Sequence, residues 1–291
     1  MKNSFMTAVL AMAACAGLTR AETTINPANR YAYGANAGWI DARADTVNGA
    51  SLGRAYCTGH LWSANLGWIS LGNTPTNGWH YSNASATDWG VNHDGAGRLT
   101  GYAWGANIGW IAFEQVYGQP RVDLLTGNLS GYAWAANVGW ISLANSQAHV
   151  QTDTLGSGAD TDGDGIPDPW EYQTAGDLMT LGGGGSDFDH DGVSDVDEAM
   201  ADTNPRDPAS RLIITAFQRA GGIDAATWPA AQTRHYRLIQ TDRLTPYPPV
   251  WSDSGHGVIQ PEGASELTKG VLNPASTQRF YRVQAIIPLS P

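Results

Sequence analysis

Cysteine is scarce in this chain of 291 residues, which carries only Cys15 and Cys57. Cys15 lies in an N-terminal apolar stretch, so Cys57 has no intramolecular partner and a disulfide-stapled scaffold is excluded. We expect Cys57 to be a small buried residue of a strand, with a reactive or intermolecular thiol as the less favoured alternative. Each module must therefore be stabilised by a hydrophobic core or by a metal.

Basic residues, and charged residues in general, are also few. Lysine and arginine number 16 against 27 aspartate and glutamate, for a net charge of −11. This excludes nucleic-acid binding, because phosphate contacts need clustered cations. Charged residues make up 15% of the chain, whereas glycine contributes 35 residues. The balance favours short strands joined by tight turns over a helical bundle or a disordered chain.

Long apolar runs are missing except near the N-terminus. Lys2 precedes an apolar stretch over 5–18 that is too short to cross a bilayer, which predicts an export signal over 1–21. We expect cleavage after Ala21 and a secreted or cell-surface location; a lipoprotein anchor at Cys15 is the less favoured alternative. No later run approaches about 18 apolar residues, so we expect no transmembrane span.

Motifs of catalysis are missing as well. The chain has no GxSxG or HExxH sequence, no phosphate-binding glycine loop and no dinucleotide fingerprint, and its seven histidines are scattered. We therefore expect that the protein is not an enzyme. An extracellular hydrolase of cell-wall or polysaccharide substrates is the least favoured function.

A repeat occupies the first part of the mature chain. Its four copies, at 31–41, 59–71, 101–113 and 131–143, share an aromatic residue, a small residue, Ala-Asn, a further apolar residue and Gly-Trp-Ile. Asn and Gly tolerate positive φ, which predicts one β-hairpin per copy with its turn at these residues. We expect the hairpins to stack as a small propeller, barrel or solenoid, because both faces of each are partly apolar.

Tryptophan is concentrated in these repeats, since nine of the 12 lie between Trp39 and Trp140. We expect Trp104 and Trp110 to face each other across a hairpin, and the recurring Gly-Trp-Ile tryptophans to fill one core position per repeat. Trp79, Tyr81 and Trp89 fall in an insertion between the second and third copies. Insertions in repeat proteins often form a binding face, so these three are candidate glycan contacts.

Acidic residues are concentrated in the second part of the chain. The segment 153–207 carries 15 acidic residues and one basic residue, a net charge of −14, whereas the net charge is −2 over 22–152 and +3 over 208–291. Such a block repels itself unless cations occupy it.

The acidic residues follow the spacing of a twelve-residue calcium loop, twice. Carboxylates stand at positions 1, 3, 5, 9 and 12, glycine stands at position 6, and the backbone carbonyl of position 7 is a further ligand. The first loop offers Asp160, Asp162, Asp164, Ile166, Asp168 and Glu171, and the second offers Asp187, Asp189, Asp191, Val193, Asp195 and Glu198. So many oxygen ligands favour calcium over magnesium. We expect a short helix after each loop and a flexible joint at 182–185 that leaves the two sites independent.

The third part of the chain alternates in the manner of short strands. About 80 residues with six such strands predict a small β-sandwich over 211–291 that resembles fibronectin type III modules. Trp228, Tyr236, Trp251 and Tyr281 are expected in its core.

Two sets of motifs carry a resemblance to known proteins. DTDGDGIPDPWE and DFDHDGVSDVDEAMADTNPRDPAS are similar to the thrombospondin type 3-like calcium repeats of exported bacterial proteins. The loop-plus-helix units are also similar to dockerins, but Glu at position 12 and the long glycine-rich spacer depart from that pattern. The GYAWxANxGWI repeats, followed by calcium loops and a β tail, resemble a group of secreted bacterial repeat proteins. The resemblance implies an exported calcium-binding protein and no particular activity.

The sequence thus predicts a mainly β fold in three parts after the signal: a Trp-rich β-repeat domain (22–152), a calcium-loop segment with short helices (153–210) and a β-sandwich-like domain (211–291). We expect a secreted or cell-surface calcium-binding structural or adhesion protein, whose loops rigidify the link between the β-repeat head and the β tail. The alternative is a carbohydrate-binding module that holds an extracellular polysaccharide or cell-surface component.

Overall fold

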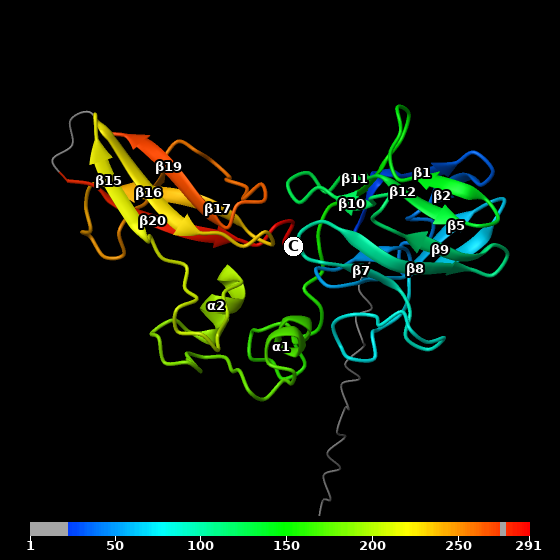
Figure 1. The fold of residues 1–291 in the computed structure, drawn as a ribbon, viewed down its shortest axis with the longest axis horizontal. Coiled ribbons are helices and arrows are strands. Elements are labelled where there is room, and N and C mark those ends of the chain that lie inside the picture. The colour runs from blue at the N-terminus through cyan, green and yellow to red at the C-terminus, as the bar shows by residue number, and fades with distance from the viewer. Residues whose placement is uncertain (1–22, 274–277) are drawn as a thin grey trace, which may run out of the picture.

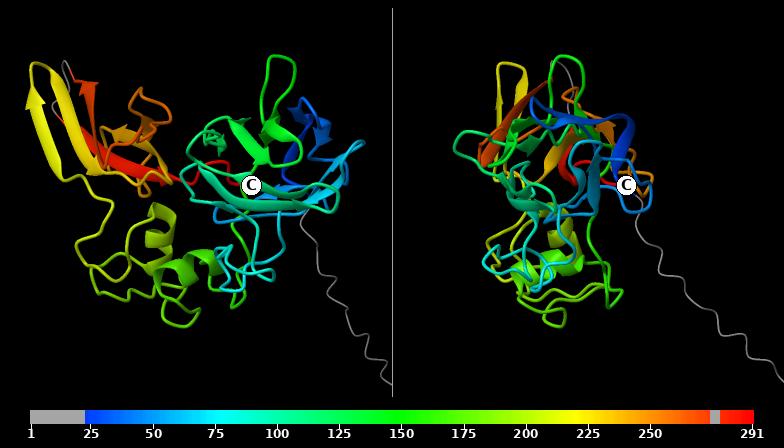
Figure 2. Two further views of the ribbon diagram at one scale, coloured as in Figure 1. Left: turned by 45° about the vertical axis from the view of Figure 1, so that its right-hand side comes forward. Right: turned by 90° about the vertical axis from the view of Figure 1, so that its right-hand side faces the viewer.

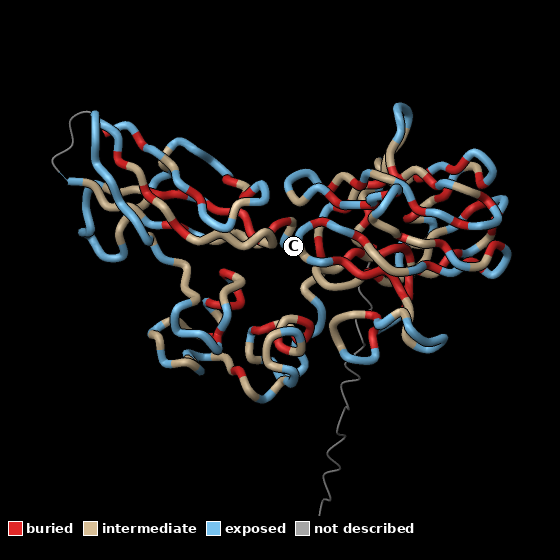
Figure 3. Tube along the Cα trace, in the orientation of Figure 1, coloured by how far each residue is buried: buried red, intermediate tan, exposed pale blue. Residues whose placement is uncertain are grey.

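Two β bodies and a helical segment make up the described part of the chain (Figure 1). The computed structural model describes residues 23–273 and 278–291; the predicted export signal and Cys15 lie outside them. The segment with α1 (Asp168–Thr174) and α2 (Asp195–Ala201) lies on one side of both bodies (Figures 1 and 2). Buried and exposed positions alternate along the strands of both bodies (Figure 3), which is the pattern of strands with one face in a core.

The four repeats form a closed antiparallel β-barrel of eight strands, two from each repeat. The strands are β1 (Ile25–Gly34), β2 (Gly38–Asp41), β5 (His60–Ser63), β6 (Gly67–Ser70), β8 (Leu99–Gly105), β9 (Gly109–Phe113), β12 (Tyr132–Ala135) and β13 (Gly139–Ser142). The ring closes where β13 pairs with β1, with Tyr33 opposite Ser142 and Gly34 opposite Ile141. Of the three expected arrangements of hairpins, the barrel is the one that forms.

Short strands supplement the barrel. They are β3 (Ser51–Leu52), β4 (Cys57–Thr58), β7 (Val91–His93), β10 (Arg121–Val122), β11 (Leu129–Ser130) and β14 (Val150–Thr152). Cys57 is 1% exposed within one of them, and burial raises the pKa of its thiol to about 12. This burial confirms the expectation of a small buried cysteine. It also disfavours the reactive alternative, because a thiol with so high a pKa is a poor nucleophile.

The tryptophans of the repeats lie on the outside of the barrel, so their expected place in the core is wrong. Trp68 is 50% exposed, whereas its neighbour Ile69 is 2% exposed. The other repeats agree: Trp39, Trp110 and Trp140 are 41–45% exposed, and Ile40, Ile111 and Ile141 are at most 4% exposed. An eight-stranded barrel is only wide enough inside for modest side chains, and a side-chain period of two places Trp and Ile on opposite faces.

Opposite each core isoleucine stands a small or modest residue, which lets the layers of the barrel fill its narrow interior. Ala103 pairs with Ile111 across one hairpin, and Ala133 pairs with Ile141 across the next. On the outer face Trp104 and Trp110 pair as expected, with ring centroids 4.7 Å apart, and the equivalent Trp134–Trp140 rings are 4.9 Å apart. The tryptophans therefore stabilise each hairpin from outside by cross-strand contact.

The recurring asparagine joins each repeat to its neighbour. The Nδ2 group of Asn107 donates to the carbonyl of Leu66 at 3.0 Å, and that of Asn137 donates to the carbonyl of Ile108 at 2.9 Å. Equivalent bonds at 3.2 Å run from Asn65 to Ala37 and from Asn36 to Val138. The four bonds make a closed ring at the turn end of the barrel, which explains why Asn recurs beside Gly in every copy.

The C-terminal body consists of two three-stranded sheets around one core. One sheet holds β15 (Ala216–Ala220), β16 (Ile223–Pro229) and β19 (Glu266–Leu272), and the other holds β18 (Ser252–Asp253), β17 (His235–Thr241) and β20 (Phe280–Ile286). Trp228 and Tyr236 are at most 1% exposed and Tyr281 packs against the same core, as expected. Trp251 is half-buried and lies outside this core, because it precedes the two-residue edge strand β18.

Because isoleucine faces the core and tryptophan faces the outside, substitutions at neighbouring positions should lower the free energy of unfolding by different amounts. Ile69→Ala should lower the free energy of unfolding by about 2–5 kcal/mol, because it leaves a cavity in the barrel. Trp68→Ala, the matched control, should cost less because half of that side chain is already exposed. Urea unfolding followed by tryptophan fluorescence measures both. A larger cost for Trp68→Ala than for Ile69→Ala would contradict this barrel.

Candidate metal centre

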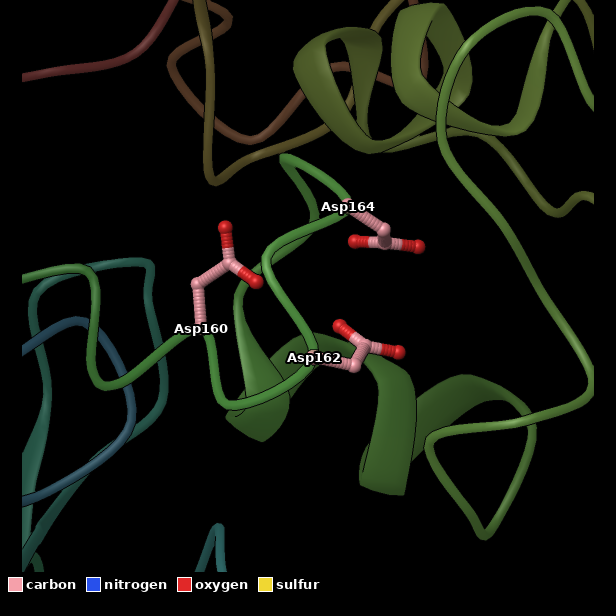
Figure 4. A group of neighbouring side chains, drawn as sticks. All are labelled: Asp160, Asp162 and Asp164. Carbon is pink, nitrogen blue, oxygen red and sulfur yellow. The ribbon is translucent and has the colours of Figure 1, made fainter.

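The first acidic loop brings three carboxylates together (Figure 4). One oxygen each from Asp160, Asp162 and Asp164 lies within 4.8 Å of the others, a group that could hold a metal ion. Asp160 is fixed by the loop backbone, since Gly163 donates its N–H to Oδ1 at 2.8 Å and Gly165 donates to Oδ2 at 3.1 Å. Gly165 has φ of +96°, so the sharp turn needs glycine there.

The second loop repeats this geometry. Asp187, Asp189 and Asp191 also place one oxygen each within 4.8 Å of the others. Gly192 donates its N–H to Oδ2 of Asp187 at 2.9 Å, as Gly165 does to Asp160 in the first loop. One feature differs, because the Nε of Arg211 lies 3.3 Å from Oδ2 of Asp191. This loop is therefore already tied to the chain that enters the C-terminal body.

The glutamate at position 12 of each loop is the most informative residue of the site. Glu171 and Glu198 are both 0% exposed. Neither oxygen of Glu171, and only Oε1 of Glu198, has a hydrogen-bond partner among the described residues. Both glutamates lie outside the groups of three converging aspartate oxygens. A buried carboxylate without partners is nevertheless costly unless a cation compensates it, so both fit a metal site.

Burial and the negative charges of nearby aspartates also raise the pKa values of the two glutamates. The pKa of Glu171 is raised to about 7, first by burial and then by the negative charges of its loop, Asp164 foremost. The pKa of Glu198 is likewise raised to about 7 by burial, with Asp189 and Asp191 adding to the rise while a hydrogen bond from Thr203 opposes it. Within residues 23–273 and 278–291 both glutamates lack a positively charged partner, since the Arg211 contact in the second loop is to Asp191.

The aspartates at position 9 hold the loop backbone. Asp168 accepts from the N–H of Thr161 at 2.7 Å and from its hydroxyl at 2.5 Å. Asp195 accepts from the N–H of Phe188 at 2.9 Å and from that of Gly182 at 3.1 Å. Each begins the helix that follows its loop, and both lie outside the groups of converging oxygens. A water-mediated contact is the usual mode of this position in calcium loops.

The residues at position 7 connect the two loops through a small core. The backbone N–H of Ile166 donates to Oδ1 of Asp164, and that of Val193 donates to Asp191, each at 2.8 Å. Their predicted role as carbonyl ligands stays a prediction. The Ile166 side chain is 0% exposed and packs with Leu181 and Ala199, so the first loop touches α2, the helix of the second.

The first half of the glycine-rich spacer packs against the loops, whereas Gly184 and Gly185 have open space around them. The flexible joint expected at 182–185 stays a prediction. Gly182 donates to Asp195, and a Cβ on Gly183 would lie 2.0 Å from the carbonyl oxygen of Asp164. Glycine is needed there because two backbones approach closely. The two loops contact each other at Gly183 and in the core around Ile166, and so form one packed unit. The independence of the two sites in binding stays a prediction.

Contacts that the sequence does not reveal attach this unit to the C-terminal body. Asp202 ends α2 in a left-handed conformation, with φ of +57°. Its carboxylate accepts from the indole N–H of Trp170 at 2.9 Å and from the hydroxyl of Thr233. Arg234 donates to the carbonyls of Ala199 and Met200 at 2.7 and 2.8 Å. No motif marks these residues, because the partners lie about 30 residues apart.

The three candidate glycan contacts do not form one surface. Tyr81 is 1% exposed, with its hydroxyl 2.5 Å from the carbonyl of Asn73, so its expected contact with a ligand is wrong. Trp89 packs edge-on against Trp110, with ring centroids 5.2 Å apart. Trp79 is half-buried and lines a cavity. Tyr81 instead serves as the anchor of the insertion.

Two further observations concern the whole chain. In the described part, no helix has the length and apolar character needed to span a bilayer. Comparisons with protein-family models, with curated proteins and with solved structures found no match to the chain. Its function is therefore argued from the site alone.

Proposed function

We propose that the protein binds two calcium ions in the loops that begin at Asp160 and Asp187, and that the ions hold residues 153–210 as a rigid connection between the barrel and the C-terminal body. The burial of Glu171 and Glu198 without a compensating cation, beside a group of converging aspartates, carries the proposal. Each loop offers four carboxylates at positions 1, 3, 5 and 12, and a carbonyl at position 7 would add a fifth ligand.

Calcium fits this set better than magnesium. Calcium accepts six to eight oxygens in flexible geometry, whereas magnesium keeps several of its waters and is bound by one or two carboxylates. Oδ2 of Asp164 and Oδ2 of Asp189 are also buried without a hydrogen-bond partner, which leaves them free to serve as ligands. Affinity of about 10⁻⁴–10⁻³ M is typical of extracellular calcium modules.

The connecting role follows from what the two helices touch. On the barrel side, the ring of Tyr172 in α1 approaches Gly78 so closely that a Cβ there would lie 2.4 Å from it. On the other side, α2 receives the guanidinium of Arg234. Without cations the net charge of −14 on 153–207 repels itself between these attachments. With the predicted export signal, this supports a secreted or cell-surface structural or adhesion protein.

Removal of calcium should open the connecting segment to protease. With calcium at about ten times its Kd, a chelator should speed cleavage within 153–210 about tenfold or more, because binding shifts the opening equilibrium by that factor. Glu171→Gln combined with Glu198→Gln should abolish the protection by calcium. Mass spectrometry of a limited digest locates the cuts.

The matched control removes two charges from the same segment without touching the loops. Asp177→Asn combined with Asp207→Asn should keep the protection, since both aspartates are exposed and lie outside the two twelve-residue loops. Equal cleavage rates of the unmodified protein in calcium and in chelator would refute the connecting role.

The raised pKa values of the glutamates predict how calcium stabilisation depends on pH. Without metal, Glu171 and Glu198 hold protons in the folded state up to about pH 7, well above the usual range of glutamate near 4.5. A raised folded-state pKa contributes stability below pH 4.5 that is lost as pH rises to 7. Calcium needs the ionised form, so its stabilisation should grow from pH 5 to 7 and level off near pH 8.

Thermal unfolding with calcium and with chelator at each pH measures this difference. Glu171→Gln combined with Glu198→Gln should flatten the curve. An increase in Tm on adding calcium that is the same at pH 5 and at pH 8 would contradict the assignment of these glutamates as ligands.

A further inference from the structure

A cavity of about 460 Å³ lies where the barrel, the helical segment and the C-terminal body meet. Its walls come from all three: Arg54 and Trp79 belong to the barrel part, Trp170 to α1, and Arg234 to the C-terminal body. Cavities of about 300–1,000 Å³ at domain junctions are the usual places for small ligands. None of the calcium-loop carboxylates lines it.

Arg54 is a cation without a protein partner in this cavity. Its backbone is fixed, since its N–H donates to the carbonyl of Gly156 at 2.9 Å. Its guanidinium makes no hydrogen bond or ion pair with any residue in the described part of the chain, and its Nε is buried. Arg54 as a whole is half-buried. A partly buried guanidinium without an anion loses part of its hydration, and a ligand carboxylate compensates that loss.

A second arginine adds to the positive charge. Arg234 is 6% exposed, donates to three backbone carbonyls and lies 3.9 Å from Asp202. The pKa of Arg54 is lowered to about 10, first by burial and second by the positive charge of Arg234. Asp202 is shared between Arg234, Trp170 and Thr233, so its charge is already engaged. Asp94 also lines the cavity, but its Oδ1 accepts the backbone N–H groups of Ala96 and Arg98, and no ion pair joins it to Arg54 within the described residues. The guanidinium of Arg54 is therefore available to an anion from outside the chain.

Beside the arginines the cavity offers aromatic surface. Trp79 and His80 stand together, with ring centroids 5.0 Å apart, and Trp170 lies on the helical side. Indole faces bind apolar ring surfaces, and a guanidinium binds a carboxylate in bidentate fashion. The two together suit a ring that bears a carboxylate.

We propose that this cavity binds a sugar acid, a pyranose ring that bears a carboxylate such as a uronic acid residue, with the carboxylate on Arg54 and the ring against Trp79. A neutral sugar covers Arg54 without supplying an anion and binds more weakly for that reason. The volume admits a unit of this size, and the opposite charges of ligand and site set the preference. The proposal does not depend on the identity of the metal in the acidic loops.

Two ligands that differ only in the charged group test the proposal. Methyl α-glucuronide and methyl α-glucoside are titrated onto the full chain in millimolar calcium and followed by ligand-observed NMR. The glucuronide should bind about tenfold more tightly, a difference of about 1.4 kcal/mol, because only its carboxylate pairs with the guanidinium of Arg54. Equal affinity for the two sugars, or no binding of the glucuronide, overturns the proposal.

Three variants, together with acetate as a competitor, test where the ligand binds. Arg54→Gln should weaken glucuronide binding at least tenfold, and Trp79→Ala should weaken both sugars. Arg121→Gln, which alters an exposed barrel arginine, should change nothing. Unchanged binding by Arg54→Gln at an unchanged Tm overturns the site, and acetate that competes as well as the glucuronide overturns the ring contact. Because both sugars are compared at one calcium concentration, failure here leaves the calcium proposal standing, and the reverse holds.

Discussion

The electrostatics of two buried carboxylates is the constraint on which the middle of this molecule depends. Glu171 and Glu198 are removed from water, lack hydrogen-bond donors for at least one oxygen each, and are repelled by the negative charges of the loop aspartates. Burial of a negative charge on these terms is tolerable only when a cation or a proton is present. The packing around them follows: Ile166 and Ala199 join the loops into one small core, and Asp202 and Arg234 attach that core to the C-terminal body.

The barrel shows which structural features the sequence pattern alone could predict. The hairpins and the Trp104–Trp110 pair follow from the period of two and from the Asn-x-Gly turns, and both are confirmed. The side that faces inward could not be read from hydrophobicity, because Trp and Ile are both apolar. Closure decides it, since the interior of eight strands accepts Ile111 opposite Ala103 and excludes the larger indole of Trp110. The hydrogen bond from Asn107 to the neighbouring repeat likewise exists only once the two repeats pack side by side, and the equivalent bond from Asn36 to Val138 only once the ring is closed.

The metal site was predictable to the extent that it is local. Spacing within twelve residues identified the aspartates that converge, because a tight loop carries its ligands in sequence order. Spacing could not show that Gly183 packs on the loop of Asp164, nor that Asp168 binds the backbone of Thr161. The role of Arg54 could not be predicted from the sequence, because its surroundings come from three regions of the chain and its distinguishing property is the absence of a partner.

Calcium stoichiometry tests the central claim most directly. Isothermal titration calorimetry of calcium into the chelator-treated full chain should give two ions per chain, and the same titration with magnesium should give much weaker binding. The shared core of the two loops favours coupled binding over the independent binding predicted from the sequence, and the shape of the titration distinguishes the two. A titration that shows no calcium bound at millimolar concentration, or equal affinity for magnesium, would contradict the account.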